Sequence, residues 1–532
     1  MRLSRISVLF LVLSVAFSCT KPEPDKKKDD GDLPEIGEKH YVEAKPSAWD
    51  GTKRGEITYQ LLCYSFADSD GNKYGDINGI TAHLDYIDAL GASAIWLSPV
   101  NECSSYHGYD VTDYYSIEPK IGKEEDFRNL IEKAHSKGIK IYMDFVLNHT
   151  SKYHPWFKEA LSNASSKYRD YYFINPDGSY KCVFGDWMPD LNYGQASACE
   201  NSPAFKDVAS AADKWIEMGV DGFRLDAVKH IYDNPSSDEN PTFLKKFYDH
   251  CNATYHKCGR SGDIYMIGEV FDEAQTVAPY YKGLPAYFEF SFWNRLQWAV
   301  NNGTGRYFCK DIKSYEPLYA KYRSKYVKGT KLSNHDEDRA ASVLGKSEAK
   351  EKLAAAVLLT SPGSPYVYQG EELGFWGTKN NGDEYVRGPI KWDSSSSVAT
   401  AALNGKIDSG TISTSMSVES QSSDKGSMLS FYRKWAELRN TYPALAQGEM
   451  SAHGTYNENN AEFNQAGVWY MTSGSQKVLV VHNFGSSQIS LSFSDKDSLT
   501  NAIALNGEMT YTVNGSKTVL SMPAYSSVVF LQ

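Results

Sequence analysis

Three acidic residues stand in or just after short apolar runs in the middle of the chain. Asp226 lies in GFRLDAV, Glu269 lies in IYMIGEV, and Asp336 follows TKLSNH. Burying a carboxylate costs free energy, so three of them in such places favour a functional site, with buried salt bridges as the alternative. If one carboxyl group is protonated and a second is ionised, the pair can donate a proton and attack an electrophilic carbon.

Basic side chains accompany these acids. Arg224 precedes Asp226 by two residues, so both side chains lie on the same face of a strand. The fixed charge of the guanidinium is expected to keep Asp226 ionised. His149 and His335 also follow apolar runs. Two carboxyl groups that differ in protonation are what cleavage of a glycosidic bond requires.

The elements that must position these residues alternate between strand and helix. Apolar runs followed by helical patterns are typical of a parallel sheet with helices on both faces. Eight such runs predict an α/β fold, a (β/α)8 TIM barrel, with a doubly wound open sheet as the alternative. Because the carboxyl ends of barrel strands share one mouth, we expect the acids to converge there. The predicted strands span residues 57–65, 94–100, 139–147, 222–228, 264–270, 286–292, 330–333 and 365–368.

Two regions depart from this alternation. Residues 150–197 form an excursion after the third strand that is too long for an ordinary loop and predicts a small inserted domain. Residues 448–532 carry short alternating strands and predict a separate antiparallel β-sandwich. The barrel would then comprise residues 46–149 and 198–447, with the Ser- and Thr-rich residues 393–427 as a long loop.

The N-terminus predicts export. Arginines followed by a short apolar stretch, residues 7–17, are typical of a secretory signal, which would occupy residues 1–18. The sequence AFSC resembles a bacterial lipobox and predicts a lipid on Cys19, with an incidental cysteine as the alternative. Residues 19–45 are charged and would form a flexible tether. No later apolar stretch is long enough to span a bilayer, so the lipid would be the only membrane anchor.

Composition narrows the class of partner. The 532 residues include 55 basic and 66 acidic side chains, and the formal charge of −11 argues against nucleic acid, which needs clustered Lys and Arg. Aromatic residues make up 13% of the chain and suit surfaces that stack on neutral sugars, although filling the core explains them equally well. The cysteines form no CxxC pair, so a zinc site is not expected. Cys182 with Cys199, and Cys251 with Cys258, could form disulfides in an oxidising compartment.

Five short segments resemble the signature regions of the α-amylase family, glycoside hydrolase family 13, and occur in the family's order. They are DFVLNH, MPDLN, GFRLDAVKH, GEV and NHD. The likeness extends from about residue 57 to the C-terminus, and is greatest for the lipoprotein α-amylases of Bacteroidetes starch-utilisation systems. It implies a barrel, an inserted domain B, a C-terminal sandwich called domain C, and starch and maltooligosaccharides as substrates. It also implies an outer-membrane lipoprotein on the cell surface that works beside a glucan-uptake complex. A periplasmic location fits the same signal.

The resemblance assigns roles residue by residue. Asp226 would be the nucleophile, Glu269 the general acid and then the base, and Asp336 would stabilise the transition state, so that the anomeric configuration is retained. The implied substrate-binding residues are His107, Tyr109, His149, Arg224, Lys229, His230, His335, Asp383 and Arg387. Tyr109 would stack on the sugar at the cleaved bond, with barrel packing as the alternative. A solvated salt bridge is the alternative for the last two residues.

Position 106 bears on where a glucan chain would be cut. Relatives that remove single glucose units resemble this segment but carry Asp where Tyr106 stands. The absence of that Asp favours an open cleft and a retaining endo-α-amylase. A neopullulanase, cyclodextrinase or exo-α-glucosidase is the alternative, and a non-catalytic glucan-binding protein is a more distant one. Trp156, Trp187, Trp376 and Trp392 are candidates for surface glucan binding, with core positions equally open.

One or two calcium sites are expected. In FADSDGNKYGD, oxygen-bearing side chains alternate around Gly71 as in an EF-hand-type loop, which suits Ca²⁺, although Mg²⁺ or a plain turn would also fit. The candidate ligands in this loop are Asp68, Asp70, Asn72, Asp76 and the Tyr74 carbonyl. The second site is implied by the resemblance and lies between the barrel and domain B. Its candidate ligands are Asn148, Asp190 and the His230 carbonyl.

Overall fold

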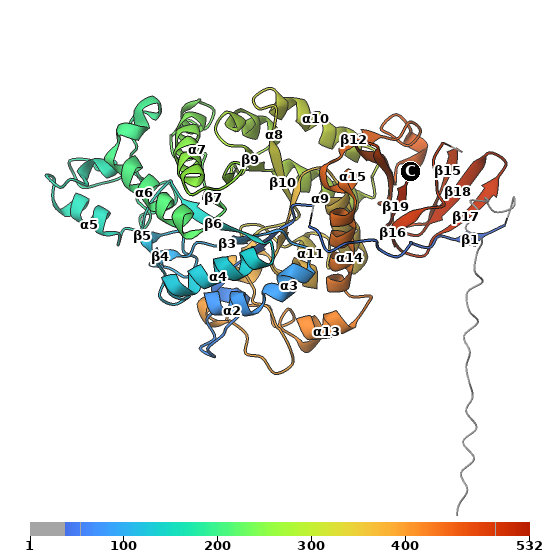
Figure 1. Ribbon diagram of the computed structural model, residues 1–532, viewed down its shortest axis with the longest axis horizontal. Coiled ribbons are helices and arrows are strands. Elements are labelled where there is room, and N and C mark those ends of the chain that lie inside the picture. The colour runs from blue at the N-terminus through green and yellow to red at the C-terminus, as the bar shows by residue number, and fades with distance from the viewer. Residues whose placement is uncertain (1–37, 54, 495) are drawn as a thin grey trace, which may run out of the picture.

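Eight parallel strands form a closed barrel (Figure 1). The computed structural model describes residues 38–53, 55–494 and 496–532, so the signal and Cys19 lie outside the described residues. In order around the barrel, the strands are β2 (Thr58–Leu61), β3 (Ala94–Leu97), β6 (Lys140–Val146), β7 (Gly222–Asp226), β8 (Tyr265–Gly268), β9 (Ala286–Phe288), β10 (Val327–Lys331) and β11 (Ser364–Tyr368). The pairing of β11 with β2 closes the ring, so the predicted barrel is confirmed and the open sheet is excluded.

Several strands are shorter than predicted, and the first and the sixth show the reason. The first ends at Leu61, and the residues after it begin helix α1 (Cys63–Phe66). The sixth ends at Phe288, and helix α9 (Phe290–Asn302) follows almost at once. In both places the start of the helix is as buried as the strand, so the apolar run continues across the boundary. An apolar run alone cannot mark where a buried strand stops.

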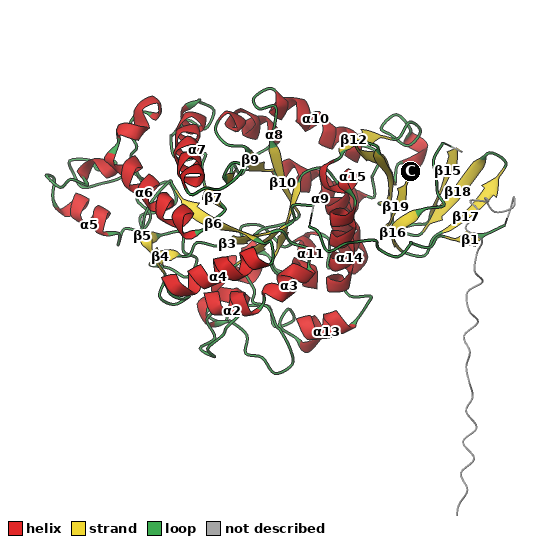
Figure 2. Ribbon diagram, viewed as in Figure 1, coloured by secondary structure: helices red, strands yellow, loops and turns green. Residues whose placement is uncertain are grey.

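Helices surround the barrel on its outer side (Figure 2). Helix α6 begins with Pro203, which suits the first helical turn, and ends before Gly219, whose φ of 126° favours glycine. Helix α12 is buried throughout residues 353–360, because α14 and domain C both pack against it. The main helices are α2 (Ile77–Ala82), α3 (Leu84–Ala89), α4 (Glu124–Ser136), α6 (Pro203–Met218), α7 (Glu239–Lys257), α9, α10 (Phe308–Ala320), α12 (Glu348–Thr360), α14 (Met428–Thr441) and α15 (Pro443–Gln447).

The segment between β6 and α6 carries little regular structure. It contains helix α5 (Pro155–Ser162) and isolated bridges that join His149 to Asp190 and Tyr172 to Leu191. A hairpin of β4 (Asn101–Cys103) and β5 (Val111–Ile117) lies earlier in the chain, directly after β3, and was not predicted from the sequence. The residues 393–427, expected as a loop, contain helix α13 (Val418–Ser423) and short 3-10 turns.

Domain C consists of two antiparallel sheets, as the predicted sandwich requires. One sheet has the strand order β12 (Glu449–Ala452), β13 (Ala466–Ser473), β14 (Gln476–Asn483), β19 (Ser526–Leu531) and β16 (Ala502–Asn506). The other has the order β1 (His40–Tyr41), β17 (Thr510–Asn514), β18 (Lys517–Met522) and β15 (Ile489–Ser494). Strand β1 falls in the expected tether, so the end of that segment is part of domain C. Main-chain hydrogen bonds such as Val42 N to Met509 O, at 2.9 Å, hold this segment on domain C. The segment has no apolar run that would have predicted a strand.

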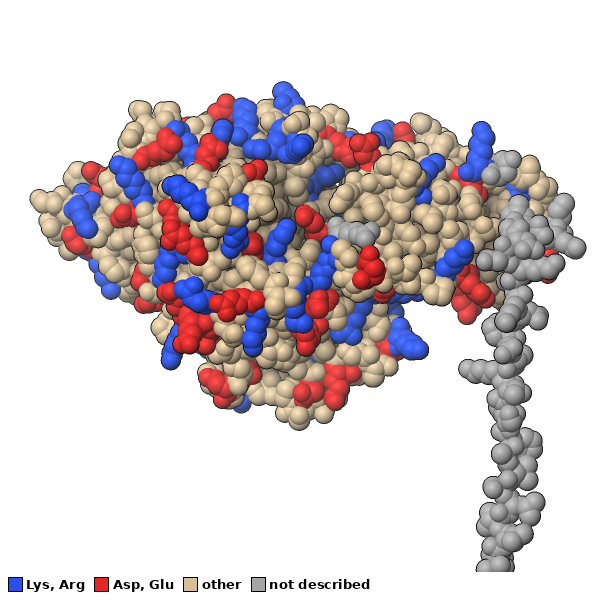
Figure 3. Space-filling view, in the orientation of Figure 1, with Lys and Arg blue, Asp and Glu red and all other residues tan. Residues whose placement is uncertain are grey.

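Three global properties follow from the described residues. All seven cysteines among them are free, so the two suggested disulfides do not form. No helix in residues 38–532, the two gaps apart, is long and apolar enough to cross a bilayer. On the face shown in Figure 3, acidic and basic side chains are interspersed rather than gathered into a basic patch.

Candidate active site

A single buried guanidinium lies among three carboxylates at the mouth of the barrel. Arg224 and Asp226 belong to β7, Asp144 to β6, and Glu269 directly follows β8. Arg224 Nη1 lies 2.7 Å from Asp226 Oδ1 and 3.0 Å from Asp144 Oδ1. Its Nη2 lies 2.8 Å from Glu269 Oε1. The strand ends therefore bring both expected reacting acids onto one cation, together with a third acid, Asp144, that the sequence analysis did not single out.

Because three acids compete for one guanidinium, the cluster retains a proton near neutral pH. Burial raises the pKa of Glu269 to about 7, and the attraction of Arg224 opposes this shift only in part. Burial raises the pKa of Asp144 to about 7 as well, and also raises that of Asp226, again against Arg224. The simple expectation that Arg224 keeps Asp226 ionised is thus incomplete, because the charge is shared.

Hydrogen bonds indicate which acid carries the proton. Asp144 accepts from Trp96 Nε1 at 3.1 Å and from Tyr109 Oη at 3.0 Å, in addition to Arg224, which suits a carboxylate. Asp226 makes the shortest contact with the guanidinium, at 2.7 Å. Asp144 has three donors and Asp226 has the shorter contact with the guanidinium, so we assign the shared proton to Glu269, whose pKa burial raises to about 7.

The backbone after Asp226 supplies one further donor. Ala227 has a φ of 48°, a left-handed conformation that is unusual for a residue with a side chain. Its N–H donates to Glu269 Oε2 at 3.2 Å. Strain of this kind costs about 1–3 kcal/mol and persists where the surrounding structure enforces it. No glycine marks this turn, so nothing in the sequence indicates it.

A second cluster surrounds Asp336, which follows β10. Gln60 Nε2 donates to His335 Nδ1 at 2.8 Å, so the neutral ring carries its proton on Nε2, which lies 3.1 Å from Asp336 Oδ2. Burial lowers the pKa of His335 to about 3. Burial opposes ionisation of Asp336, but the His335 ring and the Arg387 guanidinium, 2.9 Å away, hold its pKa well below the usual range. Asp336 is therefore ionised while Glu269 holds its proton.

These groups open into one cavity of about 480 Å³. Ten of the expected site residues line it: His107, Tyr109, His149, Asp226, Lys229, His230, Glu269, Asp336, Asp383 and Arg387. Arg224 and His335 lie beneath its surface, where both are buried. Trp187, a candidate for surface glucan binding, also lines the cavity, and five further lining residues were not predicted, namely Phe184, Met188, Ala227, Phe271 and Lys379. A volume of this size is typical of small-molecule sites.

Polar side chains around the cavity differ in charge and in partners. The His149 side chain is buried, and its Nε2 has no hydrogen-bond partner among the described residues. Burial lowers the pKa of His149 to about 4, so the ring is neutral. Asp383 extends the cluster around Asp336, because Arg387 Nη2 lies 2.9 Å from Asp383 Oδ2. Lys379 Nζ lies 3.2 Å from the other oxygen of Asp383. Arg387 is only 3% exposed, whereas the Asp383 side chain is 43% exposed, so only the arginine end of this pair is buried.

Aromatic side chains form the rim of the cavity. Trp187 is 44% exposed and Phe271 is 50% exposed, values that are high for side chains of this size. Lys229 Nζ donates to the Phe271 carbonyl at 2.8 Å, which ties the loops after β7 and β8 together. The other tryptophans considered for glucan binding, Trp156, Trp376 and Trp392, pack or hydrogen-bond within the protein.

Tyr106 lies next to this cavity. Its hydroxyl accepts a hydrogen bond from Arg387 Nη1 at 3.2 Å, and its ring packs edge-on against Tyr64, with centroids 5.2 Å apart. An aspartate here would pair with Arg387 and add a negative charge beside Asp383. Tyr106, the residue on which the expected mode of cleavage depends, therefore contacts Arg387 in the wall of the cavity.

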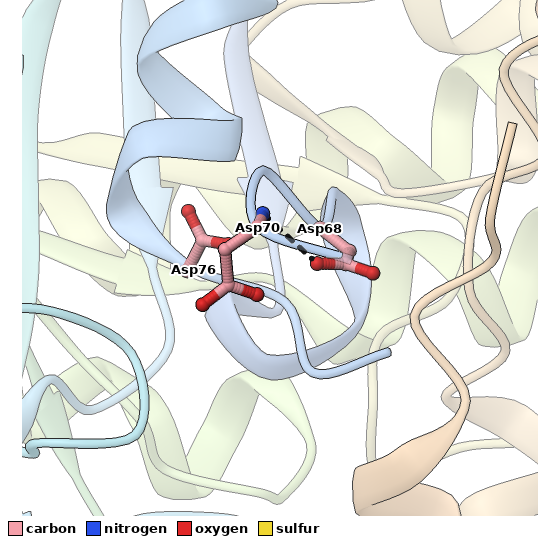
Figure 4. Close-up of side chains that lie close together, drawn as sticks. All are labelled: Asp68, Asp70 and Asp76. Carbon is pink, nitrogen blue, oxygen red and sulfur yellow. Dashed lines mark hydrogen bonds between the residues drawn. The ribbon is translucent and has the colours of Figure 1, made fainter. Parts of the chain in front are cut away.

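The predicted loop before α2 brings three carboxylates together (Figure 4). Ligand oxygens of Asp68, Asp70 and Asp76 all lie within 4.8 Å of one another. A calcium ion with Ca–O distances of about 2.4 Å spans roughly that distance between opposite ligands. Asn72 Oδ1 accepts from Tyr74 N at 2.6 Å, so these residues share the same turn. The donor set and the spacing fit one divalent cation.

The second expected metal site is different. Asn148 and Asp190 are both buried, and Asn148 Nδ2 donates to Asp190 Oδ1 at 3.4 Å. Lys181 Nζ lies 3.5 Å from Asp190 Oδ2, where the second cation would bind. The His230 ring packs edge-on against Phe184, with centroids 5.2 Å apart. One carboxylate beside an ammonium group does not fit a calcium ion, which takes six to eight oxygen ligands.

Comparisons with known proteins agree with this geometry. The family model "Alpha amylase, catalytic domain" matches residues 60–448, and "Alpha-amylase SusG C-terminal domain" matches residues 467–529. Alpha-amylase SusG of Bacteroides thetaiotaomicron is 39% identical over 99% of this chain and 98% of its own length. Alpha-amylase 3 of Dictyoglomus thermophilum is 35% identical over 86% of this chain and 89% of its own. The crystal structure of an alpha-amylase from H.orenii superposes with a TM-score of 0.79 at 31% identity, covering 90% of this chain and 99% of that one. Relatives named 4-alpha-glucanotransferase and oligo-1,6-glucosidase also match. The chain therefore belongs to the α-amylase family of glycoside hydrolases.

Proposed function

We propose that this α-amylase is a retaining endo-enzyme that cleaves internal α-1,4 bonds of starch-like glucans to maltooligosaccharides. The observation that carries the proposal is the pair of acids held by Arg224, in which Glu269 is poised to donate a proton and Asp226 to attack. Both acids line an accessible cavity with aromatic side chains at its rim. A non-catalytic glucan-binding protein would not require this arrangement.

In the first step, an Asp226 oxygen attacks the anomeric carbon while the bond from that carbon to the leaving oxygen breaks. Glu269 transfers its proton to the leaving oxygen, so the departing chain leaves as a neutral alcohol. In the second step, the Glu269 carboxylate removes a proton from water. The water oxygen then attacks the anomeric carbon and displaces Asp226, and two displacements retain the α-configuration.

The ionised Asp336 and the neutral His335 would bind sugar hydroxyls and stabilise positive charge on the ring at the transition state. Tyr109 would present its ring to the same sugar. Its hydroxyl is held by Asp144 at 3.0 Å and by His335 at 2.6 Å, which orients the ring at the cavity wall. His149 lines the same cavity and would contribute to its wall beside this sugar.

We further propose that the loop containing Asp68, Asp70 and Asp76 holds one structural ion, with calcium favoured over magnesium. The ion would offset the repulsion among these carboxylates and connect the loop to the start of α2, where Asp76 already accepts from Gly79 N at 2.7 Å. This role is structural, because the ligands of the loop do not line the cavity.

The enzyme would be an outer-membrane lipoprotein, anchored through Cys19 and displayed on the cell surface beside a glucan-uptake complex. The match of domain C to the SusG C-terminal domain model and the likeness to alpha-amylase SusG over 99% of the chain support this proposal. The described chain begins with strand β1 on domain C, so a tether would leave from that domain.

The test is the size distribution of products from soluble amylose over time, with protein lacking residues 1–19. Internal cleavage gives a spread of intermediate maltooligosaccharides and an early fall in viscosity. Glucose or maltose alone from the first time point would instead show exo-action. Binding without cleavage would overturn the assignment of Asp226 and Glu269.

A pair of variants at position 106 tests whether Tyr106 is the reason for internal cleavage. Tyr106→Asp is expected to shift products towards glucose and maltose, because a carboxylate paired with Arg387 would narrow the cleft. Tyr106→Phe keeps the ring and is expected to keep the product pattern. Equal patterns for both variants would show that Tyr106 does not decide the mode of cleavage.

A further inference from the structure

Lys181 connects the excursion after β6 to the barrel. Its Nζ lies 2.8 Å from Asp233 Oδ1, in the loop between β7 and α7, and 3.5 Å from Asp190 Oδ2, in the excursion. The Lys181 side chain is 22% exposed and the Asp190 side chain is 2% exposed. The inner partner of this ion pair is thus removed from solvent, whereas Asp233 lies at the surface. An ion pair with one buried partner is screened much less than a surface pair.

The surroundings of Asp190 require a positive charge. Asp190 Oδ1 accepts from Val183 N at 3.1 Å and from Asn148 Nδ2 at 3.4 Å. Asp190 Oδ2 and Asn148 Oδ1 are buried and make no hydrogen bond among the described residues. A buried carboxylate oxygen without a partner is costly, so a cation must compensate it. The ammonium group of Lys181 is the cation that the chain supplies.

The same place is where a calcium ion would be expected in this family. A divalent ion bound to Asp190 Oδ2 would lie next to the Lys181 ammonium, which is 3.5 Å from that oxygen. Two positive charges this close repel each other strongly in a buried site. We propose that the Lys181 ammonium is the resident cation between domain B and the barrel, and that no metal ion binds there.

The proposal gives Lys181 a positioning role for the cleft. Asn148 directly precedes His149, and His149 forms a bridge with Asp190. Asp233 lies in the loop that also carries Lys229 and His230, which line the cavity. Lys181 therefore joins two walls of the cleft through charge, without contact with the reacting atoms. Its loss is expected to alter substrate binding more than the chemical step.

Metal content is the primary test, because it does not depend on any Lys181 variant folding. The full chain is dialysed against calcium and its bound metal is counted by mass spectrometry. We expect at most one ion per chain, and none in the double variant Asp68→Asn/Asp70→Asn. One ion retained by that double variant would overturn the proposal. No ion in the unaltered chain would refute the loop site but leave the Lys181 proposal standing, so the two failures are distinguishable.

Variants at position 181 test the positioning role. Lys181→Met is expected to lower Tm and to raise KM for maltoheptaose by up to about 100-fold, with a smaller change in kcat, because the cleft walls separate. Lys181→Arg should restore much of KM because the positive charge is kept. In Lys181→Ala, added propylammonium should recover part of the loss, a response that lost packing alone would not give.

The matched control is Lys152→Met in the same excursion. Lys152 Nζ lies 3.8 Å from Asp186 Oδ2, and that aspartate side chain is 76% exposed. Removing this exposed pair should leave KM and Tm nearly unchanged. If Lys181→Met and Lys152→Met behave alike, or if neither Arg nor propylammonium restores KM, Lys181 is not the cation that organises the interface.

Discussion

Arg224 Nη2 lies 2.8 Å from Glu269 Oε1, yet Glu269 is the acid that keeps its proton near neutral pH. The same guanidinium also faces Asp144 and Asp226, so its charge is divided among three acids. Burial therefore outweighs the attraction at Glu269 and raises its pKa to about 7. This sharing allows a general acid to remain protonated next to an arginine.

The first prediction concerns the pH profile. Because Glu269 must be protonated to donate, kcat/KM on amylose should fall about tenfold per pH unit above a pKa of about 7. On the acidic side, kcat/KM should fall as Asp226 becomes protonated and can no longer attack. The measurement is kcat/KM from pH 4 to 9, in about half-unit steps chosen to resolve both limbs of the bell-shaped profile. An activity that stays level from pH 7 to 9 would contradict Glu269 as the acid of the free enzyme, because a pKa of about 7 requires a fall over that range.

A second prediction distinguishes the roles of Glu269 and Asp226 by comparing two substrates whose leaving groups differ in their need for a proton. Glu269→Gln should lower kcat on amylose by about 10²–10⁴-fold, because proton transfer to the leaving oxygen is lost. With α-maltosyl fluoride, whose fluoride departs without a proton, the first step of this variant should be nearly normal. Asp226→Asn should be inactive towards both substrates, because no nucleophile remains.

Asp272→Asn is the matched control, since Asp272 lies three residues after Glu269 and does not line the cavity. It should behave as the unaltered enzyme with both substrates. Equal losses for Glu269→Gln with amylose and with the fluoride would exclude a specific role in protonating the leaving group. A burst of fluoride release in Glu269→Gln would in turn report the glycosyl-enzyme directly.

A third prediction concerns the exposed aromatic rim. Trp187→Ala and Phe271→Ala should each raise KM for maltoheptaose about three- to tenfold with little change in kcat, because a stacking contact with a sugar is lost. Tyr153→Ala is the control, since Tyr153 is 52% exposed but does not line the cavity. The comparison is made by steady-state kinetics on maltose to maltoheptaose. A loss that is equal for every chain length would mean that the rim does not bind additional sugars.

The sequence located the reacting acids because barrel topology is strict. Asp226, Glu269 and Asp336 each follow a strand, and parallel strands of a closed barrel end at one mouth, so placing the strands places the acids. Errors of a few residues in the predicted strand ends did not matter, because they do not change which mouth of the barrel the ends share. The convergence of these three acids was therefore predictable without knowledge of any side-chain contact.

Other residues could not be found in this way. Phe184, Met188 and Phe271 lie in irregular segments whose course depends on long-range contacts, and nothing in their local sequence indicates a cavity. The sharing of the Arg224 charge among three acids could not be predicted either, because Asp144 reaches Arg224 from the neighbouring strand. Nothing in the sequence around Lys181 indicates that its ammonium group faces the buried Asp190.

The last prediction concerns the loop ion. Chelation of calcium should lower Tm by several degrees, because an ion that binds only the folded chain stabilises it by about 2.7 kcal/mol at 100 times its Kd. Added calcium should restore Tm. Asp68→Asn/Asp70→Asn should have the lowered Tm with or without chelator, whereas Asp85→Asn should respond as the unaltered chain, since Asp85 is an exposed acid outside the loop. KM should change little on chelation, because Lys181, rather than a metal ion, holds the walls of the cleft. A chelator that raises KM while leaving Tm unchanged would place the ion at the cleft instead of the loop.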